Sequence, residues 1–246
     1  MYLKTDGLVL RATEYRDADL ILTVLTKEHG LMTLKARGVR RNSSKLKGAC
    51  QLLTYAEFTI NEVRGFDTIS EAAPIEMFVE LRNDIELLAL ASYFAQMAEV
   101  LSQEDSPDPA VLTLTLNALY ALCKLKKPQE LVKATFELRA ACLAGFQPEL
   151  HGCAVCGNLT PDRFSVSGGA AVCSGCRGIE GLRLPMSPST LAAMRYIVGC
   201  DAKKLFSFDL TGPSRKELAD LAETYLVTQL ERGFYTLDFY KSLKLI

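Results

Sequence analysis

The sequence has few of the residues on which many enzyme sites depend. It contains 2 histidines, His29 and His151, which leaves little material for a histidine-dependent triad or metal centre. It has no G-x-x-x-x-G-K-[ST] phosphate loop and no G-x-G-x-x-G segment after a strand. Carboxylate pairs such as Asp17 and Asp19 lie in turn-like segments without matching partners. We therefore expect a binding protein and not an enzyme.

Long apolar runs are also missing. The longest, residues 87–95, is interrupted by Ser92 and is less than half of the roughly 20 residues that a membrane-spanning helix needs. Residues 1–7 carry Lys4 and Asp6 and lead into no apolar segment, which argues against a secretory signal. We expect a cytoplasmic protein.

The total charge has no dominant sign, because 28 Lys and Arg face 29 Asp and Glu, a net charge of -1. Locally this balance fails, since residues 29–56 hold six basic residues and no acidic one. Such a cluster attracts phosphates and releases counterions from nucleic acid, although a solvated loop is the simpler alternative. The six predicted DNA contacts are Lys35, Arg37, Arg40, Arg41, Lys45 and Lys47. Tyr55, Phe58 and Phe66 could stack on bases, but at least one of them should be core.

The first 75 residues or so show strand patterns. Short β-rich runs at residues 8–10, 20–26 and 31–35 are separated by turns, and apolar residues alternate at period two over residues 52–60. A further strand is expected at residues 69–73. Five short strands predict a small closed barrel, because a sheet this small needs its edges covered.

Beyond Pro74 the apolar residues recur at helical spacing, as expected for core-facing helices. Serine–proline pairs at residues 106–107 and 187–188 predict capped helix starts, and Gly145 predicts a left-handed helix end. The predicted helices cover residues 85–101, from 106 to about 123, 128–145, 187–199 and 213–233. The fold class is therefore α+β with two domains, residues 1–76 and 77–246, the second carrying a cysteine module at about residues 150–180.

Four of the 8 cysteines form two C-x-x-C pairs separated by 16 residues. Tetrahedral zinc needs four soft ligands, which this spacing supplies: Cys153, Cys156, Cys173 and Cys176. Four thiolates fill the coordination sphere, so we expect one structural zinc ion that braces the helices. The segment between the pairs is expected to form a hairpin with Gly168 and Gly169 at its tip. A redox dithiol is the main rival, but the βαβ context of thioredoxin-like proteins is absent. The other four cysteines are expected to be buried small hydrophobes.

Several segments together resemble the RecO family of DNA repair proteins. They are residues 37–40 (RGVR), 44–51 (SKLKGACQ), 136–138 (FEL), 145–150 (GFQPEL) and 153–157 (CAVCG). The resemblance implies an N-terminal oligonucleotide/oligosaccharide-binding (OB) barrel followed by a helical domain, which in one branch of the family bears a zinc module. It also implies a nucleoid-associated protein that binds single- and double-stranded DNA and anneals complementary strands.

The same resemblance implies protein partners. With RecR, family members help to load RecA onto DNA covered by single-stranded-DNA-binding protein (SSB), and they contact the acidic, apolar C-terminal tail of SSB through the helical region. Some members carry a basic residue directly before the FEL segment, where this chain has Thr135. Lys133 and Arg139, on neighbouring turns, are the substitutes we expect. The alternative hypothesis is a zinc-stabilised adaptor that recognises proteins and has no direct DNA function.

Overall fold

The computed structural model describes residues 2–62, 67–178 and 180–244. The chain forms two compact units, one of Met1–Thr115 together with Tyr235–Ile246 and the other of Leu116–Phe234. The expectation that a barrel domain ends at residue 76 and a helical domain follows it remains a prediction.

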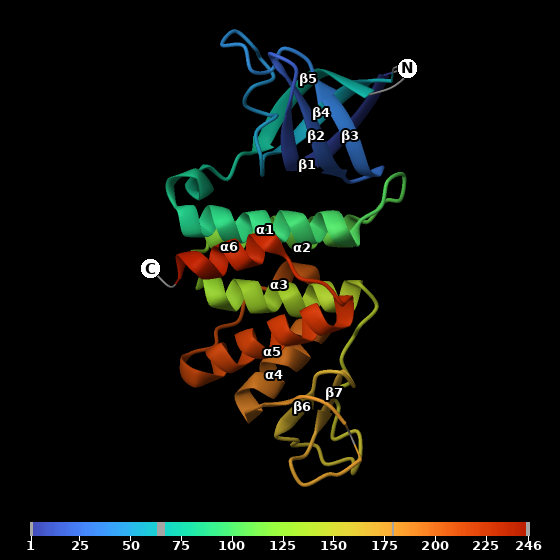
Figure 1. The fold of residues 1–246 in the computed structure, drawn as a ribbon, viewed down its shortest axis with the longest axis vertical. Coiled ribbons are helices and arrows are strands. Elements are labelled where there is room, and N and C mark those ends of the chain that lie inside the picture. The colour runs from blue at the N-terminus through green and yellow to red at the C-terminus, as the bar shows by residue number, and fades with distance from the viewer. Residues whose placement is uncertain (1, 63–66, 179, 245–246) are drawn as a thin grey trace. The chain divides into compact units, whose positions relative to one another are not determined.

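Five strands form a closed barrel in the first unit (Figure 1). They are β1 (Tyr2–Tyr15), β2 (Asp19–Thr26), β3 (Gly30–Ala36), β4 (Tyr55–Asn61) and β5 (Asp67–Glu76). Their order around the barrel is β1-β2-β3-β5-β4, and β4 closes it by pairing with β1. Only the β3–β5 pair is parallel among these strand pairs. The expected OB-type barrel is therefore confirmed.

The barrel core follows from the alternation seen in the sequence. In β4 the side chains of Ala56, Phe58 and Ile60 are fully buried and their neighbours are half-buried. The strand nevertheless begins later than the alternation predicts, because the chain makes turns at residues 51–53. Leu52 lies in these turns and keeps 36% of its surface exposed. The predicted start of this strand was therefore wrong by three residues.

Besides the barrel, the described residues of the first unit contain two complete α-helices. After the short helix η1 (Val79–Asn83), α1 (Ile85–Leu101) begins at Asp84, whose carboxylate accepts the N–H groups of Glu86 and Leu87. The helix α6 (Tyr235–Leu243) packs against α1, and Thr236 binds the side-chain oxygen of Gln96. The sequence patterns did not predict α6.

The remaining helices are α2 (Pro109–Cys123), α3 (Gln129–Leu143), α4 (Pro188–Gly199) and α5 (Gly212–Leu230), with the short η2 (Ala202–Lys204) after α4. The cap expected at Ser106 was wrong, since Asp108 accepts the N–H groups of Ala110 and Val111 at 3.2 and 3.1 Å. Asp108, two residues after Ser106, caps the helix instead, and Pro109 is the first residue of the helix. The cap at Ser187 and the left-handed turn at Gly145 are confirmed.

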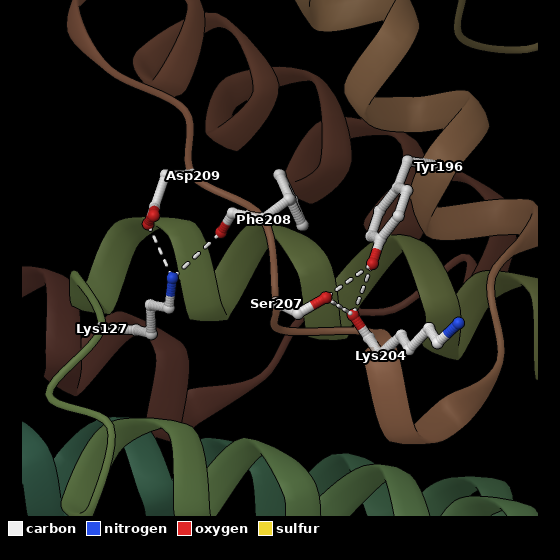
Figure 2. A network of polar contacts seen from close by, with 6 residues as sticks. All are labelled: Lys127, Tyr196, Lys204, Ser207, Phe208 and Asp209. Carbon is white, nitrogen blue, oxygen red and sulfur yellow. Dashed lines mark hydrogen bonds and ion pairs between the residues drawn. The ribbon is translucent and has the colours of Figure 1, made fainter.

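A polar network fixes the connection between α4 and α5 (Figure 2). The ammonium of Lys127 binds the carboxylate of Asp209 at 2.7 Å and the carbonyl of Phe208 at 3.2 Å. The hydroxyl of Tyr196 donates to the carbonyl of Lys204 at 2.7 Å and lies 2.8 Å from the hydroxyl of Ser207. These bonds give the carbonyl of Phe208 a side-chain donor and give the carbonyl of Lys204, which also accepts the N–H of Ser207, an additional one.

Among the described residues, no helix is both long and apolar enough to span a lipid bilayer.

Candidate nucleic-acid interface and metal centre

The cationic loop, residues 37–48, follows β3 and is held by backbone hydrogen bonds. The N–H of Gly38 donates to Asp19 Oδ1 at 2.8 Å, and the N–H of Arg40 donates to the carbonyl of Ala18 at 3.0 Å. Gly38 has a φ of 62°, which glycine adopts without steric cost. Val39 belongs to the barrel core. The loop therefore has a fixed base at the turn between β1 and β2.

Asp19 is the main polar anchor of this base. The Gly38 N–H, and then the ammonium of Lys35, hold the pKa of the Asp19 carboxyl below its ordinary value. Lys35 lies in β3, binds Asp19 Oδ2 at 3.1 Å and stands 4.7 Å from the ring centre of Tyr15. Its side chain is only 11% exposed. Of the six cations singled out in the sequence, Lys35 thus has an internal role.

The other cations of the segment are exposed. Arg40 pairs with the carboxylate of Glu14 at 3.0 Å, but that carboxylate is 71% exposed, and pairs of this kind are weak. Within the described part of the chain, no salt bridge or side-chain hydrogen bond holds Arg37, Arg41, Lys45 or Lys47. Four cations on an ordered loop are therefore open to an anionic partner.

The aromatic side chains near the loop differ in position. Phe58 is fully buried in the barrel core, as expected for at least one of the three aromatic candidates. Tyr55 is half-buried, and burial followed by the charge of Asp6 raises the pKa of its hydroxyl. Phe66 lies outside the described residues. Tyr55 is thus the candidate whose ring the structure leaves partly accessible.

The four paired cysteines converge in the second unit. Their sulfur atoms all lie within 4.8 Å of one another, with Cys153 Sγ 3.7 Å from Cys176 Sγ and Cys156 Sγ 3.8 Å from Cys173 Sγ. Four sulfurs bound tetrahedrally at Zn–S distances of about 2.3 Å would be about 3.8 Å apart. The cluster could therefore bind a metal ion without rearrangement of the chain.

Hydrogen bonds to sulfur support this arrangement. The N–H of Cys173 donates to Cys153 Sγ at 3.3 Å, and the Asn158 amide donates to Cys173 Sγ at 3.2 Å. Burial opposes ionisation of Cys153, but the N–H groups of Cys156, Val155 and Cys173 outweigh it and lower the pKa of the thiol to about 6. The sequence patterns missed Asn158, although its position directly after a C-x-x-C-G segment is the signal that could have found it.

The cysteine module is also tied to the helices of its unit. The predicted hairpin forms from β6 (Arg163–Ser165) and β7 (Ala170–Val172), and an unpredicted third strand, β8 (Arg183–Pro185), pairs with β6. The rings of Phe164 and of Tyr225 on α5 pack in a T-shaped arrangement with their centres 5.2 Å apart, and Gln229 donates to the carbonyl of Val166 at 2.9 Å. At Gly169, where φ is 60°, a Cβ would lie 2.8 Å from the Tyr225 hydroxyl. The module therefore packs against α5, and its role as a brace of the helices stays a prediction.

The two residues expected to bind a partner's tail have other contacts. Lys133 is buried, and its ammonium binds Glu137 at 2.8 Å and Glu223 at 2.7 Å. Arg139 donates to the carbonyls of Val198 and Cys200 at the end of α4. These contacts do not favour a role as exposed cations, and tail binding at the two residues stays a prediction.

Comparison with known proteins matches both parts of the chain to one family. Residues 1–78 match the family described as Recombination protein O N terminal, and residues 82–238 match Recombination protein O C terminal. The chain is 32% identical over 244 residues to the DNA repair protein RecO of Acetivibrio thermocellus, covering 98% of this chain and 97% of that protein. It is 31% identical over 242 residues to that of Desulforudis audaxviator, covering 98% and 96%.

Proposed function

The chain belongs to the RecO family of DNA repair proteins, and on that premise we propose that it is a DNA-binding recombination mediator. In this proposal it binds single- and double-stranded DNA and anneals complementary strands. With RecR it helps to load RecA onto SSB-coated single-stranded DNA, in the cytoplasm and at the nucleoid. Membership of the family supports the general role in DNA repair, and the activities and partners named here are our proposal.

The observation that carries the proposal is the set of exposed cations on the cationic loop. Arg37, Arg41, Lys45 and Lys47 have no competing salt bridge within the described residues, and the base of the loop is fixed by Asp19. Contacts between such cations and phosphates position a strand without reading its sequence. Neutralising two backbones lowers their mutual repulsion and lets base pairing proceed, so the mechanism requires no bond chemistry.

The metal in this proposal is one structural zinc ion, held by Cys153, Cys156, Cys173 and Cys176. Four thiolates leave no coordination position for an activated water, so bound zinc would supply a fixed cross-link between the two cysteine pairs. Asn158 would orient Cys173, and the Phe164–Tyr225 contact would transmit the rigidity of the module to α5.

The proposed partners follow from family membership. They are RecR, the C-terminal tail of SSB and, indirectly, RecA. Lys133 already has two carboxylate partners, and Arg139 donates to carbonyl groups at the end of α4. The SSB tail would therefore have to displace Glu223 from Lys133, or bind to cationic side chains of other residues.

Strand annealing followed by fluorescence tests the proposal. Complementary labelled strands are mixed at moderate salt, with and without SSB, and the wild type is compared with the double variant Arg41→Ala/Lys45→Ala. The matched control is Lys203→Ala/Lys204→Ala, which removes two exposed cations of η2. We expect the loop variant to anneal about tenfold more slowly and the control to behave as wild type.

Two outcomes would contradict the proposal. Equal annealing by both variants would remove the cationic loop from the mechanism. Absence of any DNA binding by the wild type at micromolar concentration would instead favour the zinc-stabilised protein adaptor.

A further inference from the structure

Sulfur atoms of the two C-x-x-C turns of the cysteine module approach one another closely. Cys156 Sγ lies 3.8 Å from Cys173 Sγ on the other turn. Cys153 Sγ lies 3.7 Å from Cys176 Sγ. Because an S–S bond is about 2.05 Å long, either pair would have to close by only about 1.7 Å to form a disulfide. A disulfide between the two turns is therefore within short reach.

The backbone holds the two turns beside each other. The N–H of Ala154 in the first turn donates to the carbonyl of Ala171 in β7 at 2.9 Å. In the second turn, the N–H of Ser174 donates to Asp162 Oδ1 at 2.7 Å. These bonds fix both ends of the contact, so the short distances between sulfurs are a property of the fold of the module.

The two sulfur pairs differ in their access to solvent. Cys156 is exposed, and Cys173 is half-buried beside the exposed amide of Asn158. Cys153, by contrast, is only 4% exposed, and the N–H of Cys173 donates to its Sγ at 3.3 Å. A small oxidant in solution therefore reaches Cys156 before Cys153, and Cys173 is the accessible partner on the other turn.

The cysteines outside the module are less suited to oxidation. Cys50 and Cys123 are each 1% exposed. Burial raises the pKa of the Cys50 thiol to about 12 and that of the Cys142 thiol to about 11, and the thiol is a far weaker nucleophile than the thiolate. Cys200 is half-buried at the end of α4, where Arg139 donates to its Sγ at 3.5 Å. Metal ligands, in contrast, are held as thiolates.

We propose that Cys156 and Cys173 form a site of reversible oxidation by small peroxides, and that their disulfide releases the metal ion from the module. The release of metal rests on the structural zinc ion proposed above. The site differs from a thioredoxin-like dithiol, whose disulfide closes within one C-x-x-C turn, because this bond joins two turns.

The reaction consumes one peroxide molecule for each disulfide. The thiolate of Cys156 attacks one oxygen of hydrogen peroxide, the O–O bond breaks, hydroxide leaves and Cys156 becomes a sulfenic acid. The thiolate of Cys173 then attacks this sulfur, and a second hydroxide leaves as the S–S bond forms. Two electrons from the two sulfurs have reduced the peroxide, and two protons from solvent convert the hydroxides to water.

The disulfide leaves the module with too few ligands to retain the metal. Cys153 and Cys176 remain as thiolates, and two sulfurs cannot complete a tetrahedral site. A second peroxide molecule would join these two cysteines in the same way. We expect this step to be slower, because Cys153 is buried.

Treatment of the full chain with hydrogen peroxide tests the site. Zinc release is followed with a chromogenic chelator, the remaining thiols are counted, and disulfides are located by mass spectrometry of non-reduced peptides. The matched control is Cys142→Ser/Cys200→Ser, which removes two half-buried cysteines outside the module and keeps all four sulfur ligands. Thermal unfolding verifies that the control is folded.

We expect about one zinc ion to be released for about two thiols lost, with the first disulfide joining Cys156 to Cys173. The control should release zinc at a rate within about twofold of the wild type, and dithiothreitol with added zinc should restore the metal content. A first disulfide between any other two cysteines, or zinc release without a disulfide, would overturn the proposal. A control that releases zinc about tenfold more slowly would also overturn it, because Cys142 or Cys200 would then be the reacting thiol.

Failure of this inference can be told apart from failure of the proposed zinc ion. The metal content before peroxide is added tests the zinc ion, and the positions of the disulfides test the oxidation site. Protein that binds zinc but keeps both its metal and its thiols under peroxide would refute the oxidation site alone. Metal-free protein that still joins Cys156 to Cys173 would refute the zinc ion and support the oxidation site.

Discussion

The cationic loop and the cysteine module use positively charged side chains in opposite ways. At the module, Arg183 of β8 donates to the carbonyl of Cys176 at 2.8 Å, and Arg195 of α4 donates to the carbonyls of Leu150 and His151, both at 2.8 Å. These arginines satisfy backbone groups of an irregular segment. In the loop, backbone hydrogen bonds to Asp19 and Ala18 hold the chain, and most cations remain exposed.

The difference shows why the number of cations in a segment is a poor guide to its role. A cation that already binds a carbonyl or a carboxylate must lose that contact before it can bind a phosphate. The cationic loop avoids this cost because a carboxylate of the neighbouring turn, Asp19, accepts a backbone N–H in place of a loop side chain. The comparison predicts that the two regions respond differently to the same kinds of change.

The largest expected effect is at the cysteine module. Cys176→Ser should abolish stoichiometric metal binding and lower the melting temperature by roughly 5 °C or more, because metal binding and local folding are coupled. Metal content by elemental analysis and thermal unfolding measure these effects. The salt dependence of DNA binding should stay as in the wild type, since the module and the cationic loop belong to different units.

Cys142→Ser is the matched control, because Cys142 lies in α3 outside the four-sulfur cluster. One bound metal ion per chain in both variants would contradict the assignment of Cys176. Loss of DNA binding in Cys176→Ser with the barrel still folded would contradict the claim that DNA binding depends on the cationic loop and not on the cysteine module.

A smaller effect should separate Lys35 from the exposed cations. Lys35→Met removes the ion pair with Asp19, whose two side chains are 11% and 18% exposed, so we expect the protein to unfold at a lower denaturant concentration than the wild type. The salt dependence of DNA binding should not change. Lys47→Met is the counterpart and should alter the salt dependence without altering stability, so the reverse pattern would contradict the distinction.

The smallest effect concerns the pH dependence of the loop base. The folded-state pKa of Asp19 lies below its unfolded value of about 3.9, so Asp19 stabilises the fold above that pH, and its contribution is lost as pH falls through the folded pKa. Chemical unfolding of the wild type and Asp19→Asn between pH 6 and strongly acidic pH measures this. The difference between the two proteins should shrink on acidification, and a constant difference would rule out the charged anchor.

The sequence predicted features whose physical cause is local. The spacing of Cys153, Cys156, Cys173 and Cys176 predicted the cluster, because each C-x-x-C turn places two sulfurs on one side of the chain. Period-two alternation predicted the buried face of β4, and the acid-free run of cations predicted an exposed loop.

Features that depend on distant residues were not predicted. The partner of Lys35 is on β2 and one carboxylate partner of Lys133 is on α5, so neither pair shows in the local charge pattern. The helix α6 has 9 residues, too few for a strong periodic signal, and it depends on packing against α1. A cavity beside the cationic loop combines residues of six separate segments, and no sequence motif describes it.

The salt dependence of single-stranded DNA binding tests the central claim most directly. The logarithm of the association constant is plotted against the logarithm of salt concentration for the wild type, Arg41→Ala/Lys45→Ala and Lys203→Ala/Lys204→Ala. We predict a slope shallower by about 1.4 for the loop variant, about 0.7 for each of the two cations removed, and an unchanged slope for the control. Equal slopes for the loop variant and the wild type would contradict the claim that the exposed cations of this loop hold DNA.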